Sequence, residues 1–329
     1  MNIHKNIKHP VSSENEGATL AGIIRVIAPE LSWSRIKKLI TQAHVKIGNE
    51  LCLDPARRVH AGEEVELLKK PESKALIKQE IKIRYLDEHL VVVEKPPGIN
   101  SVRHPAEKTW KESRKTLSPT LEDLVVKQIA SLPPKDAKGK PQRLRVVQRL
   151  DKETSGLLVF ARTPDAEKGL GRQFFNHSVE RKYLALIPGS IAAQTIESFL
   201  IRDRGDGRRG SAPFSQHGKK AVTHVHVVEN LKGFTLVGCQ LETGRTHQIR
   251  IHLAEKGSPV CGEKVYRTTA NGTILPDGSG FPRLALHAAE LGFIHPISGK
   301  PMHWNMALPD DFSNLLQRLR KPWQGIPND

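Results

Sequence analysis

An acidic side chain, Asp151, stands in a polar, glycine-containing bend between two apolar runs of the sequence. The runs at residues 146–147 and 157–161 predict strand segments. A loop at the end of a buried strand can hold a carboxylate rigidly and still leave it open to a cleft, as catalytic groups require. An aspartate in a bend is also a common turn former that accepts hydrogen bonds from following backbone amides, such as those of Glu153 or Thr154. On this stretch alone, both interpretations of Asp151 are open.

A tyrosine and an arginine lie in two further elements that the sequence predicts. Tyr183 lies in an apolar stretch at residues 179–186 that predicts a strand ending at a Pro-Gly pair. Arg250 lies in a stretch, residues 246–254, that predicts a helix with Ile249 and Leu253 on one face and His247 and Arg250 on another. An arginine beside an aspartate would keep that carboxylate ionised, and a bidentate contact would also fix its direction. The ordinary alternatives are a half-buried strand tyrosine and a surface arginine.

Several elements must position these groups. The apolar run 90–93 leads into KPPG (residues 95–98), where two prolines fix the backbone and Gly98 permits a tight turn. A helix is expected from Thr163, which precedes Pro164. Apolar residues recur every four positions along it and predict one buried face. We expect a strand at residues 222–228 as well. It carries His224 and His226 on one face, but no cysteine or carboxylate at a ligand spacing accompanies them, so no metal site is expected.

The charge of the chain indicates a polyanionic partner. The 329 residues include 51 Lys+Arg and 35 Asp+Glu, a formal net charge of +16. No basic amphipathic helix with an aromatic-rich face is visible, which favours nucleic acid over a membrane surface. The three cysteines are far apart and indicate neither disulfides nor zinc. No signal peptide or membrane-spanning run is predicted, so we expect a cytoplasmic protein that does not bind membranes.

The chain is expected to divide into unequal parts. Residues 1–16 are polar and predict a disordered lead. Helical spacing begins after Thr19, and a second helix is expected from residues 32–34, followed by a hairpin. Residues 69–80 are charged and contain proline, as a linker does. The larger domain should span residues 81–329, with a basic insertion at about 103–145 in which only residues 121–129 look helical.

Five segments carry a resemblance to one family, in the same order along the chain. They are KPPG (95–98), RLDKETSGLLVFA (149–161), VERKYLALI (179–187), TGRTHQIRIH (243–252) and LALHA (284–288). The chain thus resembles the large-subunit ribosomal pseudouridine synthases. Residues 17–68 resemble the small RNA-binding domain named after a ribosomal small-subunit protein, through SWSRIKKLI (32–40), VKIG (45–48) and AGEEVEL (61–67).

The resemblance implies a fold, an activity and site residues. The fold would be α+β, a central mixed and mainly antiparallel sheet flanked by helices and loops, with a small N-terminal α/β RNA-binding domain. Asp151 would be the essential carboxylate, Arg250 its partner and Tyr183 the ring that packs on the target base. Arg149 would fill the space that the extruded uridine leaves. Further RNA contacts are expected from the following residues: Arg35, Lys38, Arg57, Arg58 and Arg245.

The implied reaction isomerises uridine to pseudouridine in RNA, and ribosomal RNA of the large subunit is the expected substrate. It breaks the bond from uracil to ribose and rejoins the base through carbon. Because this needs no redox agent or energy source, no cofactor is expected. Gln148 departs from the family pattern, in which histidine is frequent at this position, and we expect activity to survive. We expect a monomer. The alternatives are a transfer RNA substrate and a non-catalytic RNA-binding or ribosome-assembly protein of the same fold.

Overall fold

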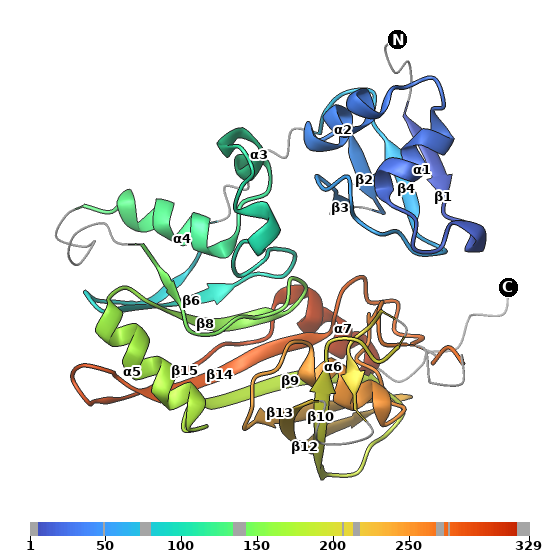
Figure 1. Ribbon diagram of the computed structural model, residues 1–329. Helices are drawn as coiled ribbons and strands as arrows, with labels where there is room; N and C mark the ends of the chain where they lie inside the picture. Colours follow the sequence, from blue (N-terminus) through green and yellow to red (C-terminus); the bar gives the residue numbers. More distant parts are fainter. Residues whose placement is uncertain are drawn as a thin grey trace, which may run out of the picture. The chain divides into compact units, whose positions relative to one another are not determined.

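The computed structural model describes residues 6–48, 50–72, 80–133, 143–205, 207–212, 218–267, 273–275 and 277–320. The chain forms two compact units (Figure 1). One holds Met1–Glu80 and Arg103–Pro119, and the other holds Ile81–Val102 and Thr120–Asp329. The expected domain boundary near residue 81 therefore coincides with a boundary between units, while most of the expected linker, residues 73–79, lies outside the described residues. Every helix within the described ranges is too short or too polar to cross a lipid bilayer.

The first unit packs two helices on a four-stranded antiparallel sheet of order β1-β4-β2-β3. The helices that pack on this sheet are α1 (Leu20–Ile27) and α2 (Trp33–Thr41), and the strands are β1 (Ile7–Pro10), β2 (Val45–Ile47), β3 (Glu50–Leu51) and β4 (Glu64–Leu67). Both helices begin where the sequence predicts, since the hydroxyls of Thr19 and Ser32 accept hydrogen bonds from the backbone amides of Gly22 and Arg35.

The expected disordered lead over residues 1–16 is wrong for the part that the structure describes. Residues 7–10 form β1, which pairs with β4 along its whole length. The Lys8 ammonium lies 2.8 Å from the Glu64 carboxylate across the two strands, and Val11 is buried. The stabilising partners of this polar segment lie more than fifty residues away in the sequence, so local composition could not indicate them.

The expected basic insertion at 103–145 is also wrong in part. Residues 103–119 group with the first unit and form a short 3-10 helix, η2 (Pro105–Glu107), and α3 (Glu112–Leu117). The guanidinium of Arg114 lies 3.3 Å from the ring centre of Trp110. A helix of six residues without apolar periodicity gives no sequence signal. Residues 134–142 of the expected insertion lie outside the described residues.

The second unit is built on an eleven-stranded mixed sheet. Nine strands follow the order β11-β10-β12-β13-β9-β14-β8-β6-β5, while β15 pairs with β14 and β7 pairs with β8. The strands are β5 (Ile83–Leu86), β6 (Leu90–Lys95), β7 (Arg145–Val146), β8 (Ser155–Ala161), β9 (Glu180–Pro188), β10 (Gln194–Ile201), β11 (Gly210–Ser211), β12 (Lys219–Leu231), β13 (Phe234–Leu241), β14 (Leu286–Ile294) and β15 (Pro301–Asn305). All pairs are antiparallel except β14 with β8. The sheet is thus mixed and mainly antiparallel, as expected.

Among its described residues, this unit also holds four helices: α4 (Leu121–Ala130), α5 (Pro164–Phe175), α6 (Gln248–Glu255) and α7 (Asp310–Arg320). Helices α4 and α5 begin at capping threonines, Thr120 and Thr163, close to the predicted starts. The buried residues of α5, Ala166 and Leu170, pack on the apolar strand β8 (Figure 1).

The parallel pair of β8 and β14 depends on a glycine. Gly156 has φ +132°, and a Cβ built at this position would lie 2.3 Å from the carbonyl oxygen of Ala288 on β14. Every residue of β8 is buried, as is usual for a strand covered on both faces. The close approach fixes β8, and the loop before it, against the middle of the sheet.

Candidate active site

The loop between β7 and β8 presents Asp151 and is held from both sides. Before the aspartate, the Ser101 hydroxyl donates to the carbonyl oxygen of Leu150 (2.7 Å) and accepts from the Leu150 amide (2.9 Å). After it, the amide of Thr154 donates to the carbonyl oxygen of Asp151 (3.1 Å). The turn is therefore closed by main-chain atoms, and the carboxylate of Asp151 is left for other partners.

Lys95 anchors the same loop from within the protein. Its side chain is fully buried, and its ammonium donates to the carbonyl oxygens of Pro96, Lys152 and Thr154 at 2.7–3.0 Å. Burial lowers the pKa of Lys95 to about 7, while the charge of Asp151 raises it. Three carbonyl acceptors match the three donors of an ammonium group, so this arrangement favours the protonated lysine. The lysine of the KPPG motif thus stabilises the loop that carries Asp151.

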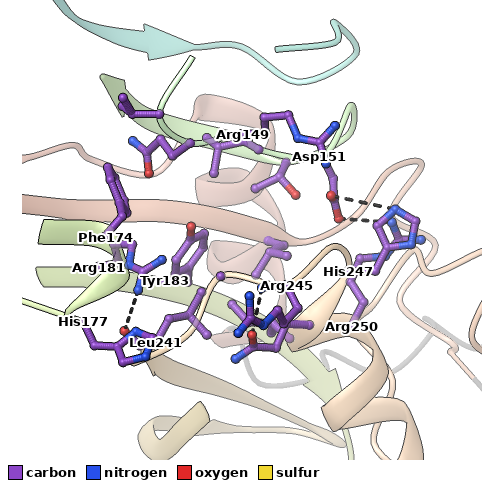
Figure 2. Close-up of a pocket in the computed structure, with 18 of the residues that line it drawn as sticks. Arg149, Asp151, Phe174, His177, Arg181, Tyr183, Leu241, Arg245, His247 and Arg250 are labelled. Atoms are coloured by element: carbon purple, nitrogen blue, oxygen red, sulfur yellow. Dashed lines mark hydrogen bonds and ion pairs between the residues drawn. The ribbon is translucent and has the colours of Figure 1, made fainter. Parts of the chain in front are cut away.

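The carboxylate of Asp151 faces the start of α6 (Figure 2). Arg250 Nη1 donates to Asp151 Oδ2 at 3.2 Å, and His247 Nε2 lies 3.8 Å from Asp151 Oδ1. His247 adopts a left-handed conformation (φ 61°) just before the first residue of α6, and its Nδ1 lies 2.7 Å from the hydroxyl of Tyr266. Burial lowers the pKa of His247, although Asp151 opposes this effect. The expected pairing of Asp151 with Arg250 agrees with this geometry.

The expected bidentate contact, however, involves a different carboxylate. Arg250 donates from Nε and Nη2 to the two oxygens of Glu263, both at 2.7 Å, and only Nη1 reaches Asp151. The Glu263 side chain is fully buried and accepts further hydrogen bonds from backbone amides of the following turn. Burial acts against the ionised form of Glu263, but hydrogen bonds and the charge of Arg250 hold its pKa below the usual value. Glu263 therefore fixes the guanidinium, and the guanidinium faces Asp151.

Tyr183 on β9 lies in the wall of the same pocket. Burial raises its pKa to about 12, so the phenol is neutral at physiological pH. The pocket has a volume of about 580 Å³, enough for one nucleotide-sized group, and Asp151, Tyr183 and Arg250 all line it (Figure 2). Gln148 also lines it, with a buried side-chain nitrogen that has no hydrogen-bond partner among the described residues.

The residues predicted to bind RNA fall into two groups. Arg149 and Arg245 are exposed side chains that line the pocket beside Asp151. The others belong to the first unit. There Arg57 pairs with Glu63 at 2.8 Å, and Arg58 donates to the carbonyl oxygen of Gly17 at 2.8 Å. The remaining two are exposed on α2: Arg35 and Lys38.

Comparison with known proteins places these residues in a family. The sequence profile described as RNA pseudouridylate synthase matches residues 89–255, which include Asp151, Tyr183 and Arg250. A protein of Zymomonas mobilis named ribosomal large subunit pseudouridine synthase D is 35% identical over 94% of this chain and 96% of its own length. The chain belongs to the RNA pseudouridylate synthase family. A synthase D of Pseudomonas aeruginosa is also 35% identical over 94% of this chain and 95% of its own length. Among solved structures, human RNA pseudouridylate synthase domain containing 4 covers 75% of this chain and 95% of its own, with a TM-score of 0.57 and 25% identity.

Three residues that contact Asp151, its loop or Arg250 in this pseudouridylate synthase were not among the predicted site residues. The sequence assigns Lys95 to a structural motif and places His247 only on the same helix face as Arg250. Glu263 was missed altogether. A glutamate that follows Gly262 in a short turn looks like a solvated surface residue, and no spacing rule in the sequence connects it to Arg250. Its role depends on how α6 and the turn after it meet in space.

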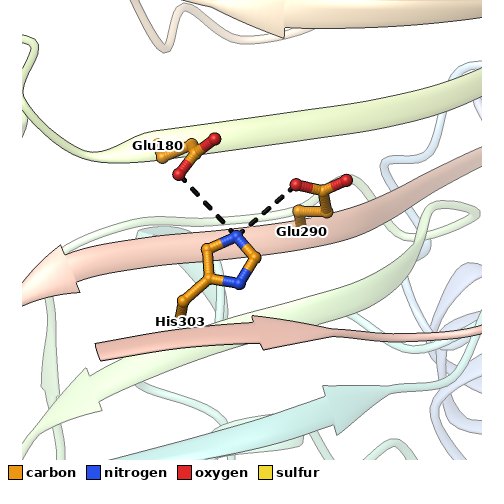
Figure 3. A group of neighbouring side chains, drawn as sticks. All are labelled: Glu180, Glu290 and His303. Carbon is orange, nitrogen blue, oxygen red and sulfur yellow. Dashed lines mark ion pairs between the residues drawn. The ribbon is translucent and has the colours of Figure 1, made fainter. Parts of the chain in front are cut away.

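A second group of titratable side chains lies away from the pocket, across β9, β14 and β15 (Figure 3). Glu180, Glu290 and His303 come together there with the geometry of potential metal ligands. The ammonium of Lys182 lies 3.0 Å from Glu180 and 2.8 Å from Glu290, so the two carboxylates already have a cation. We interpret the group as an ion-pair cluster that joins three strands. His224, one of the two strand histidines considered in the sequence analysis, lies apart from this cluster on β12. Its ring nitrogen Nε2 lies 2.7 Å from the Glu242 carboxylate.

Proposed function

We propose that this synthase converts uridine to pseudouridine in ribosomal RNA of the large subunit, with Asp151 as the essential carboxylate. The observation that carries the proposal is one pocket in which Asp151, Arg250 and Tyr183 converge from a loop, a helix and a strand. The relatives named large-subunit synthases, which match nearly the whole chain, support this class of substrate. The net charge of +16 supports a nucleic acid partner.

The chemistry follows from the geometry of the pocket. The target uridine must leave its stack, which costs a few kcal/mol, to bring its base against the neutral ring of Tyr183. Arg250, held by Glu263, keeps the Asp151 carboxylate charged and directed at the ribose or the base. The bond from N1 of uracil to C1′ of the ribose breaks, the base turns, and C5 forms the new bond to C1′. C5 then gives up its proton and N1 takes one up, so the product is an isomer of the substrate. Attack on the sugar, attack on the base and proton abstraction from the ribose all require this carboxylate.

Further RNA contacts are assigned to two exposed arginines that line the pocket and to the first unit. Arg149, next to Asp151, is proposed to occupy the space that the uridine vacates, and Arg245 to contact the backbone nearby. Residues 17–68 are proposed to be an RNA-binding domain, in which Arg35 and Lys38 are the exposed candidates for phosphate contacts. Arg57 and Arg58, which already have partners, contribute less. We also propose that the enzyme acts as a monomer, since Asp151, Tyr183 and Arg250 come together within one chain.

The Asp151→Asn variant tests the role of the carboxylate. The amide has the same shape and can still accept a hydrogen bond from Arg250, but it carries no charge. We expect no pseudouridine formation and RNA affinity within a few fold of the wild type. The measurement is tritium release from RNA containing 5-tritiated uridine, with binding followed by fluorescence anisotropy. Full activity of the variant would exclude Asp151 as the essential group.

The substrate is tested by mapping pseudouridines in ribosomal and transfer RNA from cells with and without this protein. Loss of one or more sites in large-subunit RNA is the expected result. Loss confined to transfer RNA would replace the proposed substrate. An unchanged map would contradict the proposed function.

A further inference from the structure

Arg181 is a buried cation in the wall of the active-site pocket. It lies on β9 two residues before Tyr183, so both side chains point to the same face of the strand. Arg181 is only 6% exposed, and its guanidinium lies 5.4 Å from the ring centre of Phe174. Figure 2 shows the three side chains together, apart from His247 and Arg250.

The hydrogen bonds of Arg181 leave much of its guanidinium uncommitted. Nη2 donates to the carbonyl oxygens of Leu241 (3.4 Å) and Glu242 (2.5 Å). Nε is buried and has no hydrogen-bond partner among the described residues. Nη1 lies beside Gly244, where a Cβ would come within 2.7 Å of it. A guanidinium has five N–H donors, so this side chain retains donors for another group.

Arg181 also differs from two other buried arginines in the charge that it faces. Arg250 forms a bidentate pair with Glu263, and Arg283 forms one with Asp311 at 2.6 and 2.7 Å. In the described part of the chain, no carboxylate lies within ion-pair distance of Arg181, and burial lowers its pKa. A buried charge without a counter-charge destabilises the folded state, unless a bound ligand supplies the opposite charge.

We propose that Arg181 binds a phosphate group of the RNA strand that carries the target uridine. The inference rests on the proposed function, because that function brings a polyanion into this pocket. The charges of Arg181 and Asp151 both act on the pKa of Tyr183, and the three side chains line the same pocket. A nucleotide whose base packs on Tyr183 would enter the pocket that Arg181 lines, and a phosphate of the same strand would then be within reach of this guanidinium. The planar donors of a guanidinium fit phosphate oxygens, and Phe174 holds that plane in place.

The experiment measures how salt affects RNA binding. All variants carry Asp151→Asn to prevent turnover, and the probe is a fluorescent, unmodified transcript of the RNA region that the wild-type enzyme modifies. Binding is measured between 50 and 300 mM KCl for the parent, Arg181→Met and Arg181→Lys. The matched control is Arg320→Met, because Arg320 is paired with Glu229 and does not line the pocket.

We expect Arg181→Met to lower the affinity about tenfold at 150 mM salt and to reduce the slope of log K against log[KCl] by about 0.7, as loss of one phosphate contact requires. Arg181→Lys should keep the parental slope, and the control should match the parent. The melting temperature of Arg181→Met without RNA should equal or exceed that of the parent, since methionine fills the space and buries no charge.

Three results would overturn the inference. A parental affinity and slope in Arg181→Met would show that no phosphate is bound there. A weaker affinity with an unchanged slope would indicate contact with a neutral part of the nucleotide. A large fall in melting temperature, or failure to fold, would make Arg181 a structural cation. Failure of the proposed function is separate, because the wild-type enzyme would then modify no ribosomal RNA.

Discussion

Replacing Glu263 by glutamine tests whether this buried carboxylate positions the active site through Arg250. In the native protein Glu263 accepts two charge-assisted hydrogen bonds of 2.7 Å from Arg250, and Asp151 accepts one of 3.2 Å. In Glu263→Gln one acceptor oxygen becomes an NH₂ group that faces an N–H donor. The guanidinium then loses its negative partner on the buried side and is free to turn toward Asp151, the remaining carboxylate.

The contacts of Glu263 set the expected changes in folding stability, kcat and KM. Breaking a buried ion pair by removing one partner typically costs about 3–5 kcal/mol of folding stability. Misalignment of the carboxylate of Asp151 should lower kcat about 10- to 100-fold, which corresponds to about 1.4–2.7 kcal/mol of the activation barrier. KM should stay within about threefold, because Glu263 is fully buried and cannot touch RNA.

The assay is single-turnover tritium release at a temperature at which circular dichroism shows the variant folded. Glu229→Gln is the matched control, since Glu229 forms a similar bidentate pair with Arg320 (2.8 and 2.6 Å) outside the pocket. Glu263→Asp, which keeps the charge, should recover part of the lost rate. A folded Glu263→Gln enzyme with kcat within twofold of the wild type would refute the positioning role, as would an equal loss in the control.

Two other predictions concern the support of the loop and the response to pH. Lys95→Met removes the ammonium that donates to the carbonyl oxygens of Lys152 and Thr154. Thermal melts should show a loss of about 1–3 kcal/mol in the free energy of unfolding, and kcat should fall at least tenfold. A wild-type rate would show that the loop of Asp151 does not need this contact. Burial lowers the pKa of His252 to about 4 in the folded protein, whereas the unfolded chain has the ordinary histidine pKa of ~6.5. Below pH ~6.5 the unfolded chain therefore takes up a proton on His252 that the folded protein does not. The free energy of unfolding should fall by about 2 kcal/mol between pH 6.5 and pH 5. Urea unfolding at pH 7 and pH 5 should show a smaller pH dependence for His252→Gln than for the wild type, and an identical dependence in both proteins would contradict the assignment.

The sequence predicts the parts of the site that have local patterns. Asp151 could be placed at the end of a buried strand because apolar runs flank its bend, and Tyr183 lies on a strand with clear β-propensity. The family motifs then join Asp151, Tyr183 and Arg250. The second partner of Arg250 could not be found in this way, because Glu263 belongs to a turn without periodicity, and the bidentate contact was therefore assigned to the wrong carboxylate.

For the fold as well, the sequence predicts only the elements that have a local pattern. Helices with capping threonines and apolar stripes, such as those after Thr120 and Thr163, were predicted close to their observed starts. Strand β1 and helix α3 were not, because each is short and polar. Strand β1 depends on pairing with β4, far away in the sequence. Elements of this kind depend on tertiary partners, and neither propensity nor composition reports those partners.

The position of β14 in the sheet has a consequence for the synthesis of the protein. This strand, residues 286–294, lies between β9, which carries Tyr183, and β8, which follows the loop of Asp151. As a nascent chain leaves the ribosome from its N-terminus, the loop of Asp151 and strand β9 emerge before the strand that lies between them in the sheet. A ribosome stalled before residue 286 would thus hold a chain with all the pocket's acidic and basic groups but without the ability to modify RNA.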